Sequence, residues 1–322
     1  MSMFRRASKV KKMFKICGFG PTGSGKTIFA LTFPRPRYID MESGTDWYIG
    51  RKVIPEQNDD FDLLNTKSAG KVINAIDEIE RDLEKDPECI ESVVLDPVTV
   101  FWDALQEAYL DKMRRKNSDF EIKFQHWKSI KGPYKQAMTT LINLPVNLIL
   151  IGRESAEYEM KGEKLVQVGT RISTEKDTPY LADIYLRFFT KKDKNGNEIF
   201  LTQVEKDRTN LMKKGTIIEN LTYQKLRAWA DEQGIADGSG EERRVETDKQ
   251  VTDQDSKVFD EETTNSYESL IYHEKIVPLY EELDWAPGKV KALIEKHGLV
   301  SVQTLGKFLS DKVREMRDAK ND

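Results

Sequence analysis

One glycine-rich segment constrains the fold of this chain more than any other feature: Gly20-Pro21-Thr22-Gly23-Ser24-Gly25-Lys26-Thr27. It fits the phosphate-loop pattern G-x-x-x-x-G-K-[ST] at every position. A short, largely apolar run precedes it at residues 14–19, and a helical pattern begins at residue 28. In a strand–loop–helix unit, backbone N–H groups and the positive end of the helix surround phosphate oxygens. The motif therefore predicts a nucleotide site; a glycine-rich turn without a ligand is the alternative.

Each part of this motif has an expected role. Gly20 to Gly25 would hold phosphate groups through the backbone, and Lys26 would reach the β- and γ-phosphates. The Thr27 hydroxyl would bind Mg²⁺ directly. ATP and Mg²⁺ are therefore the expected ligands.

Apolar runs alternate with helical patterns through the first half of the chain. The runs are short and continuous, as in strands that are buried on both faces, and the pattern favours an α/β fold with a mostly parallel sheet. We expect strands at residues 37–40, 92–96 and 146–152, and helices at residues 68–84, 101–113 and 127–144.

The pattern changes after residue 153. Residues 164–172 and 183–189 alternate in polarity, and Asn195-Gly196 lies at the centre of a predicted hairpin turn. Residues 198–204 would form the returning strand, and residues 221–230 a closing helix.

Composition divides the chain into four expected segments. They are a basic N-terminal arm (1–13), an ATPase core (14–230), an acidic flexible linker (231–264) and a small C-terminal helical domain (265–322). The linker has 12 acidic residues against 4 basic ones and no apolar periodicity. The last segment shows three short helical patterns, at residues 267–283, 287–297 and 301–317.

Two carboxylates are candidates for the chemistry. Asp96 ends an apolar strand, where a carboxylate would act on Mg²⁺ through water; capping the next helix is the alternative. Hydrolysis also needs a carboxylate that orients or deprotonates water, and Asp40 and Glu42 follow the second strand. We choose Glu42 as the base, and an exposed loop acid is the alternative.

The segment Tyr38-Ile39-Asp40-Met41-Glu42 resembles the second-strand signature of RecA-like recombinases, in which the glutamate polarises the attacking water. The order of phosphate loop, acidic strand and Val-Val-Leu-Asp is also the RecA-like order. The resemblance implies a RecA-like P-loop NTPase core. It places Arg153 where the family usually has a glutamine that senses the γ-phosphate, so this chain departs from the pattern there. Arg153 would either sense phosphate or bind DNA.

The resemblance extends to two further segments. Residues 154–169 correspond to the family's mobile second DNA loop, although acidic and basic residues are mixed here. Lys206 and Arg208 correspond to basic residues that reach the neighbouring subunit's ATP, and strand alternation would place both on one face. The alternative is a surface strand with two solvated cations.

The combined features are similar to the phage-encoded single-strand annealing ATPases of the Sak group. This likeness implies a DNA-dependent ATP hydrolase that forms a homo-oligomer on single-stranded DNA and promotes annealing or strand exchange, in the cytoplasm of a bacterial host. A ring-shaped helicase, translocase or loader is the first alternative, and a nucleotide-dependent switch or packaging accessory that does not act on DNA is the second.

Residues 112–135 are the expected DNA-binding segment, with interleaved aromatic rings. Residues 111–135 contain eight basic residues against three acidic ones. Cations that follow phosphates and rings that stack on bases suit single-strand binding. The alternative is a helical hairpin with solvated lysines, in which Trp127 belongs to the core. The DNA-binding candidates are Lys112, Arg114, Arg115, Lys116, Lys123, Trp127, Lys128 and Lys131.

Phe4 and Ala7 fit an F-x-x-A pattern that relatives in the recombinase family use for polymerisation. They would dock into the next subunit; a phosphate-binding basic tail is the alternative. The C-terminal helical domain would bind a protein partner, such as a single-strand binding protein, or pack on the core.

The remaining composition excludes some classes of protein. Cys17 and Cys89 match no metal-binding spacing, and Cys17 is expected to be buried in the first strand. No apolar run approaches the length that a membrane span requires, so we expect no membrane partner.

Overall fold

The computed structural model describes residues 12–162, 164–235, 271, 273, 275–297 and 302–321. The chain divides into two compact units, Met1–Val245 and Glu246–Asp322, and each is considered by itself. Phe4, Ala7 and most of the predicted linker lie outside the described residues. Among the described residues, no helix combines the length and apolar character needed to cross a membrane.

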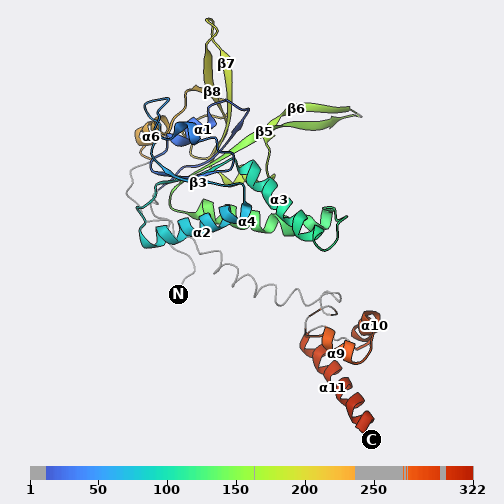
Figure 1. Cartoon of the computed structure of the whole chain (residues 1–322). Helices are drawn as coiled ribbons and strands as arrows, with labels where there is room; N and C mark the ends of the chain where they lie inside the picture. Colours follow the sequence, from blue (N-terminus) through green and yellow to red (C-terminus); the bar gives the residue numbers. More distant parts are fainter. Residues whose placement is uncertain are drawn as a thin grey trace. The chain divides into compact units, whose positions relative to one another are not determined.

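A nine-stranded sheet organises the first unit (Figure 1). Its order is β3-β2-β4-β5-β1-β7-β8-β9, with β6 paired to β5. The strands β3, β2, β4, β5, β1 and β7 run parallel, whereas β6, β8 and β9 pair antiparallel. The bounds are β1 Lys15–Gly20, β2 Pro36–Asp40, β3 Asp62–Asn65, β4 Ser92–Asp96, β5 Asn147–Lys161, β6 Lys164–Ile172, β7 Ile184–Lys192, β8 Glu198–Asp207 and β9 Ile217–Glu219.

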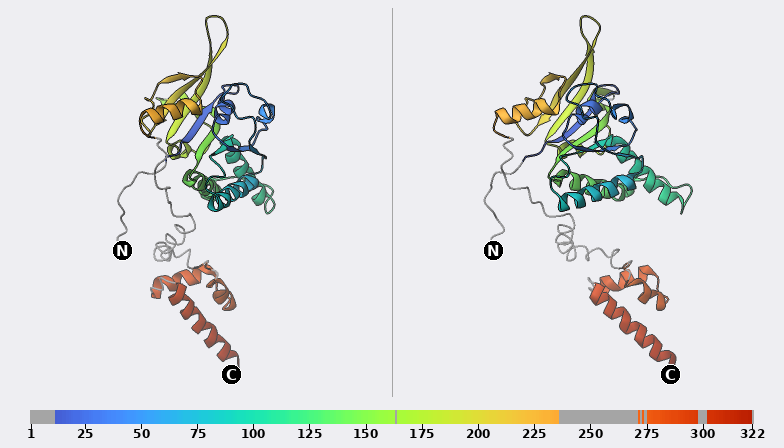
Figure 2. Two further views of the ribbon diagram at one scale, coloured as in Figure 1. Left: turned by 90° about the vertical axis from the view of Figure 1, so that its left-hand side faces the viewer. Right: turned by 60° about the vertical axis from the view of Figure 1, so that its left-hand side comes forward.

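Helices cover both faces of this sheet, as Figures 1 and 2 show. One face carries α2, α3 and α4, and the other carries α1 and α6. This three-layer arrangement is the expected α/β fold with a mostly parallel sheet. The helices are α1 Lys26–Leu31, α2 Ala69–Lys85, α3 Val98–Arg114, α4 Trp127–Asn143, the short α5 Thr178–Leu181 and α6 Tyr223–Glu232.

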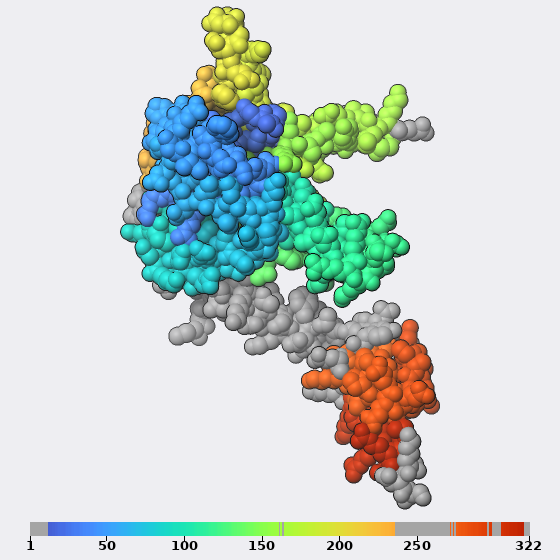
Figure 3. Space-filling model, in the orientation of Figure 1, coloured from blue at the N-terminus to red at the C-terminus, as the bar shows by residue number. Residues whose placement is uncertain are grey.

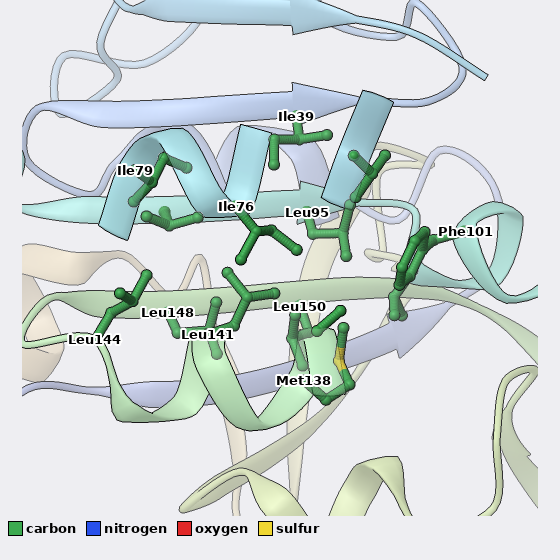
Figure 4. Close-up of a cluster of buried hydrophobic side chains, with 14 of the residues drawn as sticks. Ile39, Ile76, Ile79, Leu95, Phe101, Met138, Leu141, Leu144, Leu148 and Leu150 are labelled. Atoms are coloured by element: carbon green, nitrogen blue, oxygen red, sulfur yellow. The ribbon is translucent and has the colours of Figure 1, made fainter. Parts of the chain in front are cut away.

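The helix α2 illustrates how the sequence produces these layers. Ser68 begins it, and the serine side chain accepts a hydrogen bond from the Lys71 N–H at 3.3 Å. Four apolar residues at helical spacing form its buried stripe: Val72, Ile76, Ile79 and Leu83. This stripe packs on strand residues such as Leu95 and Leu148 (Figure 4).

Two parts of the fold differ from the expectations. β3 was not predicted, because only two of its four residues are apolar. Residues 154–169, expected as a mobile loop, form most of a hairpin in which β5 continues past Arg153 and pairs with β6, with a register shift between Glu157 and Tyr158. The sequence carries the reason: Tyr158 and Met160 alternate with acidic residues, and Gly162 takes a positive φ of 66° at the turn.

The second unit has a helical core of its own. It contains α9 Val277–Glu282, α10 Pro287–His297 and α11 Val302–Asn321. Nine buried apolar side chains form this core: Ile271, Ile276, Tyr280, Leu283, Val290, Ile294, Leu305, Leu309 and Val313. A surface ion pair joins Arg317 to Glu282 at 2.6 Å.

Candidate functional site

The glycine-rich loop joins β1 directly to α1 at the carboxyl end of the parallel strands. Gly23 and Gly25 have φ angles of 76° and 85°, a region that favours glycine. Lys26 folds back over the loop, and its Nζ donates to the carbonyl oxygens of Gly20 at 3.0 Å and Pro21 at 2.7 Å. The ammonium group therefore lies inside the loop, where phosphate oxygens would replace these carbonyl partners.

Burial and nearby charges shift the pKa of Lys26 in opposite directions. Burial lowers the pKa of Lys26, while the carboxylates of Asp96 and Glu154 act to raise it. The net shift is downward. A bound phosphate would add negative charge beside the ammonium group and favour its charged form.

Asp96 is half-buried at the end of β4 and contacts the loop directly. Its Oδ2 accepts hydrogen bonds from Thr27 Oγ1 at 2.9 Å and from the Tyr38 hydroxyl at 2.6 Å. Burial raises the pKa of Asp96, which these two hydrogen bonds partly oppose. The residue before α3 is Pro97 and makes no side-chain cap, so Asp96 is directed to Thr27 rather than to the helix start.

This oxygen pair has the chemistry that Mg²⁺ requires. A threonine hydroxyl and a carboxylate are hard oxygen donors, and Mg²⁺ typically takes one or two such protein groups together with phosphate oxygens and water. Thr27 and Asp96 are already held together, so the residues fit the ion. Both were predicted as metal-site residues, and that role stays a prediction.

Asp96→Asn is expected to weaken Mg²⁺-dependent ATP binding by about 10- to 100-fold, since one charge and one acceptor beside Thr27 are lost. Titration of a fluorescent ATP analogue at several Mg²⁺ concentrations measures this. Asp111→Asn, at an exposed position on α3, is the matched control. Equal Mg²⁺ dependence in wild type and Asp96→Asn would contradict the assignment.

Glu42 lies just beyond β2 and pairs with Arg153 across the sheet. The Arg153 Nη2 donates to Glu42 Oε1. Buried Asp40 fixes the backbone beneath Glu42: its Oδ1 accepts the Glu42 N–H at 2.8 Å, and its Oδ2 accepts from the Thr45 N–H and hydroxyl. Asp40 thus holds the local backbone, whereas Glu42 is partly exposed and faces Arg153.

The two cations predicted to act on a neighbouring subunit's ATP differ in their surroundings. Lys206 Nζ donates to three carbonyl oxygens of its own chain, at Pro179, Tyr180 and Ala182. Arg208 lies one residue past β8 and approaches Asp183 at 4.0 Å with its side chain half exposed. Lys206 therefore holds the residues of α5 and its end in place, and Arg208 is the more exposed and less engaged cation. Their action on a second subunit stays a prediction.

The predicted DNA-binding residues lie at the tip formed by the end of α3, the connection and the start of α4. Most of them are exposed: Lys112, Arg114, Arg115, Lys116, Lys123 and Lys128. Two are engaged within the fold. Trp127 stacks on Trp102 with ring centroids 6.1 Å apart, and Lys131 Nζ donates to buried Glu175 at 2.7 Å.

Sequence reasoning missed two groups at this site. Tyr38 was noted only as part of a strand signature, yet its hydroxyl binds Asp96. Thr99, buried at the start of α3, accepts the Arg153 backbone N–H at 3.0 Å. Both contacts join residues that are more than fifty positions apart, so only the strand order brings them together.

The sheet order, the glycine-rich loop and the Thr27–Asp96 contact define a P-loop NTPase. A comparison with protein families agrees: the model described as "AAA domain" matches residues 12–214, which is more than half of the chain. The chain belongs to this family of P-loop ATPases. None of the curated proteins searched matches it.

Proposed function

We propose that this protein hydrolyses ATP in response to single-stranded DNA and assembles on that DNA to promote annealing or strand exchange. AAA-domain membership supports the nucleotide-dependent part. The likeness to Sak-group ATPases, which rests on Tyr38–Glu42 and residues 205–209, motivates the recombination part.

The side chains at the site support a simple route for hydrolysis. Glu42 would take a proton from water as the water oxygen attacks the γ-phosphorus. The bond from that phosphorus to the β–γ bridging oxygen breaks, and ADP leaves with the electron pair. Lys26 would neutralise charge on the phosphate oxygens. Mg²⁺, when bound near Thr27 and Asp96, would supply further neutralisation.

The exposed basic tip, formed by the end of α3, the connection and the start of α4, supports the DNA-binding part of the proposal. Besides its cations it presents Phe124, whose exposed fraction of 93% is the highest among the large apolar side chains that the structure describes as exposed. The ring is thus open to solvent in the part of the chain that the structure describes. A ring among cations is the combination that stacks on bases while phosphates are neutralised.

The β5–β6 hairpin supports the same interpretation. Met160 and Leu165 are cross-strand partners and therefore share a face, and they are 65% and 64% exposed. Tyr158, two residues from Met160, lies on that face too and is also exposed. In Figures 1 and 3 the hairpin and the α3–α4 tip project toward the same side of the first unit. A single strand of DNA would bind between the hairpin and the α3–α4 tip.

The triple variant Lys112→Ala/Arg115→Ala/Lys116→Ala is expected to weaken binding to oligo-dT at least tenfold. The slope of log affinity against log salt concentration should become shallower by about two. Arg114 is left in place, because its Nε contacts the Phe120 carbonyl oxygen. Fluorescence anisotropy across a salt series measures both quantities. The control Lys71→Ala/Arg81→Ala/Lys85→Ala removes three exposed cations from α2.

Two measurements on wild-type protein separate the candidate functions. ATP turnover is measured with and without single-stranded DNA, and complexes with DNA and an ATP analogue are imaged. Stimulated turnover and open filaments support the proposal. Closed rings with strand unwinding favour a ring helicase or loader instead. A monomer whose turnover ignores DNA would overturn the proposal and favour a nucleotide switch.

A further inference from the structure

Glu154 and Arg187, which have no assigned role in the site described so far, form an ion pair next to the end of β1. Arg153 is the β5 partner of Gly20, so the next β5 residue, Glu154, lies beyond the point where β1 becomes the phosphate loop. On the other flank of β1, Arg187 of β7 is the partner of Phe19. The Arg187 Nη2 and Glu154 Oε2 atoms are 3.5 Å apart, and the pair therefore bridges the start of the loop.

This pair is incompletely satisfied. Glu154 Oε2 and Arg187 Nε are both buried, and neither has a hydrogen-bond partner among the described residues. A structural arginine–carboxylate pair is normally bidentate, and leaving such atoms without partners inside a protein costs free energy. The unfilled donor at Arg187 Nε therefore points to a ligand that is rich in acceptors.

The location identifies the kind of ligand. Glu154 acts electrostatically on Lys26, so its carboxylate lies near the phosphate-binding ammonium group. Arg187 is on the same face of β7 as Tyr185, whose ring stacks on Phe19 with ring centroids 4.9 Å apart. The guanidinium also lies 5.9 Å from the Phe189 ring. A cation on a rigid strand beside the phosphate loop suits a phosphate oxygen.

We propose that Arg187 is a catalytic residue that contacts the γ-phosphate of the ATP bound by its own chain, and that Glu154 is a positioning residue that holds the guanidinium before ATP enters. The inference rests on the proposed ATPase function. Arg187 would donate to γ-phosphate oxygens as the bond from water forms and the bond to ADP breaks, and it would take no proton. Its contribution is the neutralisation of charge on the transferred group.

The test compares ligands with and without a γ-phosphate. In Arg187→Ala we expect affinity for a non-hydrolysable ATP analogue to fall about tenfold or more while ADP affinity changes less than about twofold; kcat should fall roughly 10²-fold. Arg187→Gln, which keeps much of the side-chain stem, should show the same selective loss. Arg81→Ala, an exposed arginine on α2, should match wild type. Calorimetry and steady-state turnover provide the values.

Several outcomes would overturn the assignment. One is an equal loss for ADP and the ATP analogue, and another is unchanged analogue affinity in a folded Arg187→Gln protein. These differ from failure of the proposed function, in which wild-type protein itself neither binds nor hydrolyses ATP.

Glu154→Gln tests the positioning role with a second readout. It removes the charge that holds the Arg187 guanidinium, so affinity for the ATP analogue should fall several-fold while ADP affinity changes less than about twofold. We also expect kcat to fall about tenfold through the loosened Arg187. Glu84→Gln on α2 is the control. Wild-type analogue affinity and wild-type kcat in Glu154→Gln would remove Glu154 from the proposal.

Discussion

Lys26→Ala is expected to abolish ATP turnover and to weaken nucleotide binding more than any other single change in this chain. The ammonium group lies inside the phosphate loop on the carbonyl oxygens of Gly20 and Pro21, so it is already placed for the phosphate groups. Its removal leaves the β- and γ-phosphates without their nearest cation. We expect a loss of about 10³-fold in kcat, measured by phosphate release under saturating ATP.

The control for this change is Lys71→Ala, at an exposed position on α2 that is far in sequence from the loop. Thermal unfolding of both variants should stay close to that of wild type, because Lys26 makes its hydrogen bonds within the loop rather than to the core. Turnover in Lys26→Ala within tenfold of wild type would show that the loop is not the hydrolytic site.

Glu42→Gln should give the second large effect, and it separates binding from chemistry. Glutamine keeps the shape of the side chain and can still accept from Arg153, but it cannot take a proton from water. We expect kcat to fall about 10²- to 10⁴-fold with ATP affinity nearly unchanged. Rapid-quench measurement of one turnover, together with equilibrium binding of ATP, gives both quantities.

Glu56→Gln is the matched control for this variant, since Glu56 is an exposed acid in the same loop region. A protein with Gln at position 42 that hydrolyses ATP at a near-normal rate would rule out Glu42 as the base. Turnover lost together with ATP affinity would show instead that Glu42 acts through the arrangement of the site.

Much of the sheet was predictable because local signals and the fold agree. The loop motif at residues 20–27 and the apolar run ending at Asp96 predict their own surroundings, and the structure joins them through Thr27. The stripe on α2 and the Asn195-Gly196 turn are equally local. Such features need only nearby residues to be interpreted.

The remainder depends on partners that the sequence does not place next to each other. Glu154 and Arg187 are separated by 33 positions and meet only because β5 and β7 flank β1. The same holds for Lys131, predicted as a DNA contact: its partner Glu175 follows a hairpin that was expected as a loop. Local patterns cannot show that a lysine on a basic helix is already engaged.

The Lys131–Glu175 ion pair connects α4 to the segment that follows β6. Glu175 is almost fully buried, and burial would raise its pKa, but the Lys131 ammonium and the Asp177 N–H outweigh this and lower it. Tyr134, also on α4, reinforces the junction through hydroxyl contacts to Thr174 and Thr178.

This junction anchors the base of the β5–β6 hairpin to the helix that begins at the basic tip. The Ser173 N–H binds the Arg153 carbonyl oxygen at 2.8 Å, so the same segment continues to the residue that pairs with Glu42. A short series of hydrogen-bonded residues therefore connects the basic tip and the base of the hairpin to the proposed catalytic base.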